Sequence, residues 1–237
     1  EPRKDLFADI PILLEDIGER AVTFAFDTTS FGCWGMEVLG PENTLISSQT
    51  EPDLLKAVCR LANDAHLKNL RAILEQGFEV VYDSWFQCGP SVGWSPDTYQ
   101  NVFLPLITEV INLAHEFDAI YIYQDDGKMK DIILCLVEAG VDCISGLQPP
   151  EVGDVVLEEV KKKYGNKVAL YGGLDSCHAF DMGNPDVVRE AVRQAIVDAG
   201  EMGGYIIGTG EAVDPTLTTP ECLRASADAA KEFGVYK

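Results

Sequence analysis

Polar and acidic residues follow each of several short apolar runs in this sequence. They occupy residues 27–30, 83–85, 124–127, 148–151, 172–176 and 209–211, and they include Ser84, Asp126 and Glu211. Carboxyl and hydroxyl groups of this kind bind polar substrates and exchange protons with them. Turns favour Asp, Ser and Gly in any protein, so each segment alone is equally well explained as a loop. In parallel α/β folds, however, the strands end at one rim where active sites lie, and six such segments favour a functional rim.

Ready-made catalytic motifs do not account for these residues. The sequence has no glycine-rich phosphate loop, no dinucleotide fingerprint, no paired-histidine zinc motif and no serine elbow. His66 and His115 fall in helical stretches, where we expect surface or packing roles. His178 follows the fifth strand-like run and is the one histidine expected near a site. No histidine is adjacent to Ser84 in sequence, so a nucleophilic triad is not supported.

The elements that must position these residues alternate along the chain. Short β-branched or aromatic runs predict strands at residues 22–26, 79–83, 119–123, 143–147, 168–171 and 205–208. Apolar residues at spacings of three and four predict amphipathic helices over residues 52–76 and 186–199. Glycine follows four helical stretches, at Gly77, Gly140, Gly165 and Gly200, where we expect left-handed helix caps. These repeated units predict an α/β fold of parallel strands in a single domain over residues 1–237.

Composition restricts the class of protein further. The chain has 237 residues, and its formal net charge of −21 repels the phosphate backbone of nucleic acids and anionic lipid surfaces. No apolar run is long enough to span a membrane, and the N-terminus has no signal-peptide core. Seven scattered cysteines without a C-x-x-C pair indicate mostly buried thiols in a reducing compartment. We therefore expect a cytoplasmic protein that binds neither nucleic acid nor membranes.

Two strand-end segments carry a family resemblance. In order and spacing, the chain resembles the uroporphyrinogen decarboxylase superfamily at residues 82–85 (Tyr-Asp-Ser-Trp) and 171–175 (Tyr-Gly-Gly-Leu-Asp), and it has a Gly-Thr-Gly segment at 208–210. The resemblance implies a TIM-type (β/α)8 barrel in which the six predicted strands correspond to the third to eighth. The first two βα units have no counterpart, so we expect a preceding segment that is cut away or supplied by another chain. The resemblance also implies a homodimer.

The resemblance assigns roles to single residues. Ser84 matches the serine that contacts substrate in this family, and Asp175 matches the aspartate of a late turn. The decarboxylases have a histidine where this chain has Thr209, and their tyrosine has no obvious counterpart around residues 33–35. We expect substrate contacts from the strand-end residues Asp83, Trp85, Gln124, Asp125, Asp175 and Thr209.

The superfamily also contains corrinoid-linked methyltransferases, which hold zinc through a histidine-x-cysteine-glycine segment and a late cysteine. The corresponding segment here is residues 124–127 (Gln-Asp-Asp-Gly), and the late loop offers Glu211, so oxygen donors replace the soft ligands. The carboxylates of Asp125, Asp126 and Glu211 could bind a divalent metal, or protonate an ether oxygen if one carboxyl has a raised pKa. Alternatively, Asp125 and Asp126 form a turn that caps a helix at residues 128–136.

The resemblance and the missing histidine and tyrosine together indicate an enzyme that transfers a methyl group to or from a corrinoid protein. Ser84, Asp126 and Glu211 are its predicted catalytic residues. A small molecule or a corrinoid protein is the expected partner, and a corrinoid or a divalent metal is the candidate cofactor. A decarboxylase that acts on a tetrapyrrole carboxylate is the first alternative. A ligand-binding barrel without catalytic activity is the second.

Overall fold

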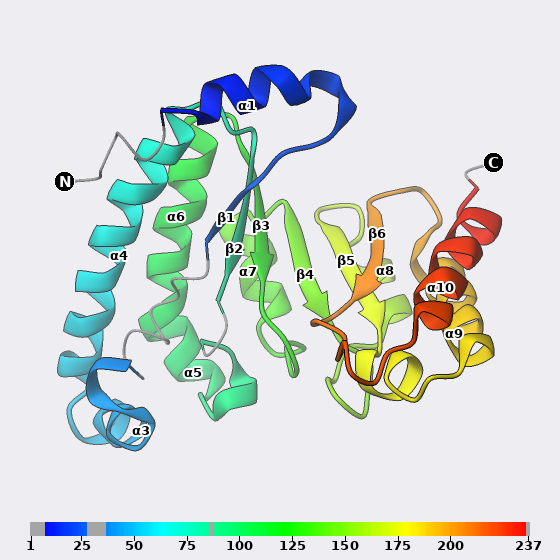
Figure 1. The fold of residues 1–237 in the computed structure, drawn as a ribbon. Helices are drawn as coiled ribbons and strands as arrows, with labels where there is room; N and C mark the ends of the chain where they lie inside the picture. Colours follow the sequence, from blue (N-terminus) through cyan, green and yellow to red (C-terminus); the bar gives the residue numbers. More distant parts are fainter. Residues whose placement is uncertain (1–7, 28–36, 86–87, 236–237) are drawn as a thin grey trace. The chain divides into compact units, whose positions relative to one another are not determined.

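The computed structural model describes residues 8–27, 37–85 and 88–235 (Figure 1). The chain divides into two compact units. The first comprises Glu1–Gln124 and Leu134–Asp142, and the second comprises Asp125–Ile133 and Cys143–Lys237. The single domain expected over the whole chain stays a prediction.

Three parallel strands form the sheet of the first unit, in the order β1 (Ala25–Asp27), β2 (Val80–Ser84) and β3 (Ile120–Gln124). Helix α4 (Pro52–Leu74) buries one stripe of side chains spaced three or four residues apart, which includes Leu55, Cys59, Ala62, His66 and Leu70. Helix α6 (Leu104–Glu116) contacts both α4 and β3. The other elements are α1 (Ile10–Ile17), η2 (Gly18–Arg20), α3 (Pro41–Thr50), η3 (Pro90–Val92), α5 (Pro96–Thr98), η4 (Tyr99–Phe103) and α7 (Ile133–Ala139).

Three further parallel strands form the sheet of the second unit, in the order β4 (Cys143–Leu147), β5 (Ala169–Leu174) and β6 (Tyr205–Thr209). Helix α8 (Leu157–Tyr164) lies between β4 and β5 in sequence, and α9 (Pro185–Ala199) lies between β5 and β6. A short π-helical turn, η5 (Ser176–Phe180), follows β5, and α10 (Pro220–Phe233) follows β6. Each strand is therefore followed by a helical segment, which places the strand-end loops of this unit at one edge of its sheet.

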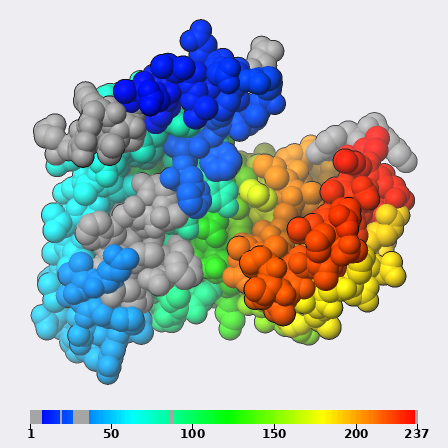
Figure 2. All heavy atoms as spheres, viewed as in Figure 1, coloured from blue at the N-terminus to red at the C-terminus, as the bar shows by residue number. Residues whose placement is uncertain are grey.

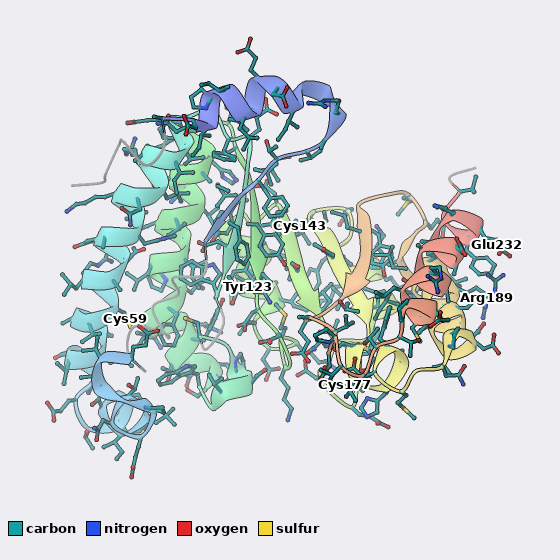
Figure 3. All side chains as sticks on the ribbon, in the orientation of Figure 1. Cys59, Tyr123, Cys143, Cys177, Arg189 and Glu232 are labelled. Atoms are coloured by element: carbon teal, nitrogen blue, oxygen red, sulfur yellow. The ribbon has the colours of Figure 1, made fainter. Side chains whose placement is uncertain are left out.

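Helices α9 and α10 pack against each other on the outside of the second unit. Figure 2 shows them as the adjoining yellow and red surfaces. Arg189 of α9 pairs with both carboxylate oxygens of Glu232 in α10 at 2.7 Å, and its guanidinium carbon lies 4.8 Å from the centre of the Phe233 ring (Figure 3). Side-chain caps at Asn184 and Thr219 fix where the two helices begin.

The six predicted strands are confirmed, five of them with shifted ends. The strand predicted at residues 22–26 is the least accurate, because the structure has only Ala25–Asp27 there. Val22 and Phe24 lie outside it with exposed side chains, 79% and 50% accessible. The β-branched and aromatic run that predicted a longer strand therefore begins before the residues that pair with β2.

Two predictions about helix ends are wrong. Gly77 and Gly140 have the expected positive φ angles of 99° and 91°, but Gly165 and Gly200 keep right-handed φ angles of −65° and −74°. The helix predicted at residues 128–136 begins only at Ile133. Asp154 explains the delay, since its Oδ1 accepts the backbone N–H groups of Met129 and Lys130 at 2.9 and 3.0 Å. These two bonds hold the segment as a turn rather than a helix.

The cysteines are mostly buried, as their scatter indicates. Cys59, Cys88, Cys143 and Cys222 are buried, and Cys177 is exposed at the start of η5. Burial raises the pKa of the Cys59 thiol to about 12, so this thiol stays protonated at neutral pH. None of the helices in the described ranges is both long enough and apolar enough to cross a bilayer.

Candidate functional site

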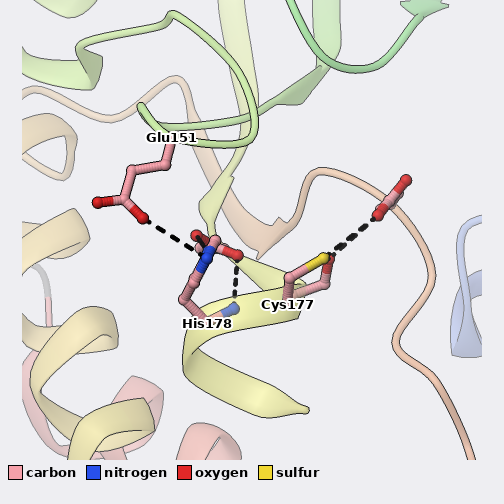
Figure 4. A network of polar contacts seen from close by, with 6 residues as sticks. Glu151, Cys177 and His178 are labelled. Carbon is pink, nitrogen blue, oxygen red and sulfur yellow. Dashed lines mark hydrogen bonds and ion pairs between the residues drawn. The ribbon is translucent and has the colours of Figure 1, made fainter. Parts of the chain in front are cut away.

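An aspartate and a histidine that follow β5 are hydrogen-bonded to each other. Asp175 caps η5: its Oδ1 accepts the backbone N–H of His178 at 2.9 Å, and its Oδ2 lies 2.7 Å from His178 Nδ1 (Figure 4). A carboxylate can only accept, so Nδ1 carries the proton. The second ring nitrogen, Nε2, lies 3.5 Å from the carboxylate of Glu151. The hydrogen bond to Asp175, helped by the charges of Asp175 and Glu151, raises the pKa of His178.

Glu211 follows β6 and faces the start of η5. Its Oε1 accepts from the hydroxyl of Ser176 at 3.5 Å and lies 3.9 Å from the sulfur of Cys177 (Figure 4). Thr209, the last residue of β6, is half-buried one step before the buried Gly210. Asp175 and Glu211, predicted from separate segments, therefore lie at neighbouring strand ends, on either side of Ser176 and Cys177.

Residues 125–127 are held tightly against β4 and the segment that follows it. Asp125 is buried; its N–H donates to the carbonyl of Ser145 at 3.4 Å and its Oδ1 accepts the N–H of Asp126 at 2.9 Å. Gly146 has a φ of 87°, and a Cβ there would lie 1.6 Å from the carbonyl oxygen of Asp125. The buried side chain of Gln148 accepts the N–H of Gly127 at 2.5 Å. The loop is thus fixed by contacts that require glycine at position 146.

Asp126 is the half-buried carboxyl of this loop. Burial raises its pKa, and a backbone hydrogen bond offsets part of the increase. A carboxyl with a raised pKa keeps its proton closer to neutral pH, which is what proton donation to a substrate oxygen requires. The condition set for a general acid among the predicted carboxylates is therefore met at Asp126.

The same carboxylates do not form a metal centre. Among the described residues, no three side chains of His, Cys, Asp or Glu converge in a way that could hold a metal ion. Asp125 is buried, whereas Glu211 is exposed and contacts Ser176 and Cys177 instead. This set of oxygen donors does not fit the zinc of the methyltransferase branch.

In the first unit, Ser84 and Gln124 form a pair at adjacent strand ends. They are register partners on β2 and β3, and the Ser84 hydroxyl donates to the Gln124 side-chain carbonyl at 2.5 Å. Ser84 is 7% exposed. The pair presents one hydroxyl and one amide from neighbouring strands, and its contact with substrate stays a prediction.

Asp83 lies inside a buried polar network of the same unit. Its Oδ2 is 3.2 Å from His66 Nε2 and accepts the hydroxyl of Tyr121 at 2.8 Å. The Trp85 indole N–H in turn donates to the Tyr121 oxygen at 2.7 Å. Asp83 and Trp85 are 1% and 0% exposed, so the structure shows them in the packing between β2, β3 and α4. Their predicted contact with substrate is not supported by exposure and stays a prediction.

His66 is the residue of this network that sequence reasoning placed only as a surface or packing residue. Its position on the apolar stripe of α4, four residues after Ala62 and four before Leu70, is the signal that predicts its burial. Nothing in the sequence links it to Asp83, which lies 17 residues away in the next element. The segment around residues 33–35, where the family tyrosine was sought, lies outside the described residues.

Fold and site together define a parallel α/β protein with polar and acidic groups at the carboxyl ends of its strands. The chain belongs to the uroporphyrinogen decarboxylase (URO-D) family, whose profile matches residues 6–233. This confirms the family resemblance seen in the strand-end segments.

Curated relatives are similar over most of this chain. Uroporphyrinogen decarboxylase of Pseudoalteromonas translucida is 24% identical over 191 residues, which cover 77% of this chain and 49% of the relative. The corresponding protein of Nitrosospira multiformis is 26% identical over 181 residues, which cover 72% of this chain and 44% of the relative. The chain thus spans about half the length of the curated relatives it matches.

A solved structure gives the fold. A methyltransferase from Methanosarcina mazei matches 95% of this chain and 63% of its own with a TM-score of 0.78, at 18% sequence identity. At this identity the similarity establishes the fold alone. It confirms the predicted α/β class, and six parallel strands fit part of a TIM-type barrel.

Proposed function

We propose that this protein is an enzyme that transfers a methyl group between a small-molecule donor and a corrinoid protein. Family membership supports an enzyme, and a methyltransferase shows that the same fold also occurs with this class of reaction. The observation that carries the proposal is Asp126, a half-buried carboxyl with a raised pKa at the carboxyl end of a strand. A soluble homodimer in the cytoplasm is part of the same proposal.

Asp126 is suited to a donor that carries its methyl group on oxygen. When the carbon–oxygen bond breaks, its electron pair stays on the oxygen, and the proton of Asp126 neutralises that charge. The corrinoid supplies the electron pair of the new bond to the methyl carbon, so its cobalt goes from the +1 to the +3 state. Donor and proton therefore become an alcohol, and the methyl group leaves on the corrinoid with atoms and electrons balanced.

Other residues fix the position of Asp126 or add groups to the proposed chemistry. Asp125 and Gln148 fix the backbone on either side of Asp126 through its own N–H and that of Gly127. Glu211, held near Ser176, adds a carboxylate at the end of β6 and is the second proposed catalytic group of this unit. In the first unit, Ser84 stays a proposed catalytic residue, and its hydroxyl bonds to the side chain of Gln124.

Decarboxylation of a tetrapyrrole is the alternative, and the curated relatives favour it because they are uroporphyrinogen decarboxylases. Against it stands Thr209, which occupies the position where the family resemblance requires histidine. A hydroxyl of this kind cannot take the charged form that an imidazole can. The decarboxylase proposal therefore needs another group in that role.

A spectroscopic assay tests the proposal. The purified protein is mixed under nitrogen with cobalamin prereduced by titanium(III) citrate and with 3-methoxybenzoate as methyl donor. We expect the spectrum of methylcobalamin to develop at a rate proportional to protein concentration, and slowly in the Asp126→Asn variant. Turnover of uroporphyrinogen by the same preparation, without methylation of cobalamin, would establish the alternative instead.

A further inference from the structure

The proposed reaction leaves the Asp175–His178 pair without a role. Both oxygens of Asp175 are engaged by His178, one by its backbone N–H at 2.9 Å and one by its ring at 2.7 Å. The Asp175 side chain is 14% exposed, so the carboxylate that orients the ring is itself well packed. The imidazole is 52% exposed and therefore accessible from solvent. The ring is held by one nitrogen and presents the other outward.

The outward nitrogen already faces a carboxylate of the protein. Glu151 Oε2 lies 3.5 Å from His178 Nε2, from the segment that follows β4. Its side chain is 81% exposed, and an ion pair this open contributes little to stability. A ligand carboxylate that arrived with further contacts would displace it at little cost. Glu151 thus marks the place where a carboxylate oxygen can receive a hydrogen bond from Nε2–H.

The charged groups around His178 determine when it can bind an anion. Asp175 and Glu151 are the charged groups that face His178, one from the end of β5 and one from the segment after β4. Together they raise the pKa of His178, so the cationic form persists to higher pH. A net charge of −21 repels anions from the chain as a whole, so a ligand carboxylate depends on a direct ion pair with a cation such as His178.

We propose that His178, oriented by Asp175, binds a carboxylate group of the substrate through Nε2–H, with Glu151 occupying that position in the free protein. This inference rests on the proposed function and narrows it, because the methyl donor then belongs to the class of carboxylate-bearing methyl ethers. Asp126 protonates the oxygen of the donor, and His178 holds the anionic end of the same molecule.

Binding without turnover tests the inference separately from the reaction. The protein is labelled with 13C-histidine and titrated with benzoate, and with benzamide as a neutral compound of the same shape. We expect benzoate to move the His178 ring signal and to bind at least tenfold more tightly than benzamide. His115, which pairs with Asp142 at 2.9 Å on the first unit, provides the control signal and should not move.

Variants separate the roles of the two partners. Glu151→Gln removes the competing carboxylate, so it should tighten benzoate binding several-fold. His178→Gln should abolish the preference for benzoate, while the matched His115→Gln variant should keep it. In the wild type, the preference should fall as the pH rises through the raised pKa of His178, and Asp175→Asn should move that fall to lower pH.

Other results would overturn the inference. Equal binding of benzoate and benzamide would do so, as would a preference that survives in His178→Gln, or weaker benzoate binding in Glu151→Gln. Selective benzoate binding at His178 in a protein that methylates no cobalamin would uphold the subsite and refute the proposed methyl transfer. The two proposals therefore fail in distinguishable ways.

Discussion

Asp126 and its neighbour Asp125 differ in burial and in the contacts that they make. Asp125 is buried and accepts the N–H of Asp126, whereas Asp126 is half-buried and has a raised pKa. The first residue therefore supports the loop, and the second is the one that we propose as proton donor. Sequence reasoning grouped both with Glu211 as one cluster, and the structure assigns them different positions.

The acid role of Asp126 predicts a large effect of one substitution. Asp126→Asn removes the proton but keeps the shape, so methyl transfer to cobalamin should fall by about 100-fold or more. The matched variant Asp131→Asn, at an exposed position of the same segment, should keep the wild-type rate. Equal losses of the methyl-transfer rate in both variants would show that the rate depends on the structure of this segment and not on the Asp126 carboxyl.

The direction of the Asp126 shift also fixes a pH dependence. Because burial raises its pKa, the protonated acid persists above the usual range of an aspartate and is lost as the pH rises through the raised value. The rate with a methyl ether should therefore decline on the alkaline side of that pKa. A rate that instead increases across this range would exclude Asp126 as the acid. The pH profile of kcat in wild type and Asp126→Asn provides the measurement.

At the scale of elements, the loop after β3 depends on a glycine of β4. Gly146→Ala would place a Cβ 1.6 Å from the carbonyl of Asp125, at a φ of +87°. We expect the free energy of unfolding to fall by more than about 3 kcal/mol, since backbone must move to relieve the overlap. Gly203 is the control: its φ is +74°, and a Cβ there meets nothing within 4 Å. Gly203→Ala should cost only about 1 kcal/mol in urea unfolding.

Asp154 predicts a smaller effect on the same part of the fold. Asp154→Ala leaves the N–H groups of Met129 and Lys130 without this acceptor, which should cost about 1–2 kcal/mol. Asp154→Asn keeps Oδ1 and should recover most of the loss. Faster hydrogen exchange at both amides in Asp154→Ala, and not in Asp154→Asn, would locate the effect. Unchanged exchange in both variants would refute this account of the late start of α7.

The elements that sequence patterns predicted well are those determined by local chemistry. β4 was predicted with its observed ends, Cys143–Leu147, because an apolar run of strand length is bounded by polar residues. Contacts between distant segments were not predictable in the same way. The helix after β3 starts late because of Asp154, and the pairing of His66 with Asp83 needs two elements to meet. Neither partner carries a local signal for the other.

The candidate site also has features that the local sequence predicts and features that depend on contacts between distant segments. That polar groups would follow the strands could be inferred from the alternation of elements, and Asp175 and Glu211 lie at such ends. The burial of Asp83 and Trp85 could not, because neighbouring strand residues point to opposite faces and only the packed helix decides which face is covered. His178 gained its importance from Asp175, three residues earlier, a spacing that the η5 turn converts into a contact.

For the whole molecule, membership of the family and the type of reaction are separate questions. The chain belongs to the URO-D family, the curated relatives are decarboxylases, and a methyltransferase shares its fold. The proposal of methyl transfer rests on the second unit, which has a half-buried carboxyl with a raised pKa at Asp126 and a threonine at position 209, where the decarboxylases have a histidine.

A side-by-side rate measurement tests this claim most directly. One preparation of the protein is given prereduced cobalamin with 3-methoxybenzoate labelled in its methyl carbon, and in a parallel reaction uroporphyrinogen labelled in its acetate carboxyl groups. The account predicts that label accumulates on cobalamin in proportion to protein and time, while no labelled carbon dioxide forms above the protein-free control. Release of labelled carbon dioxide at enzymatic rates, with unlabelled cobalamin, would contradict it.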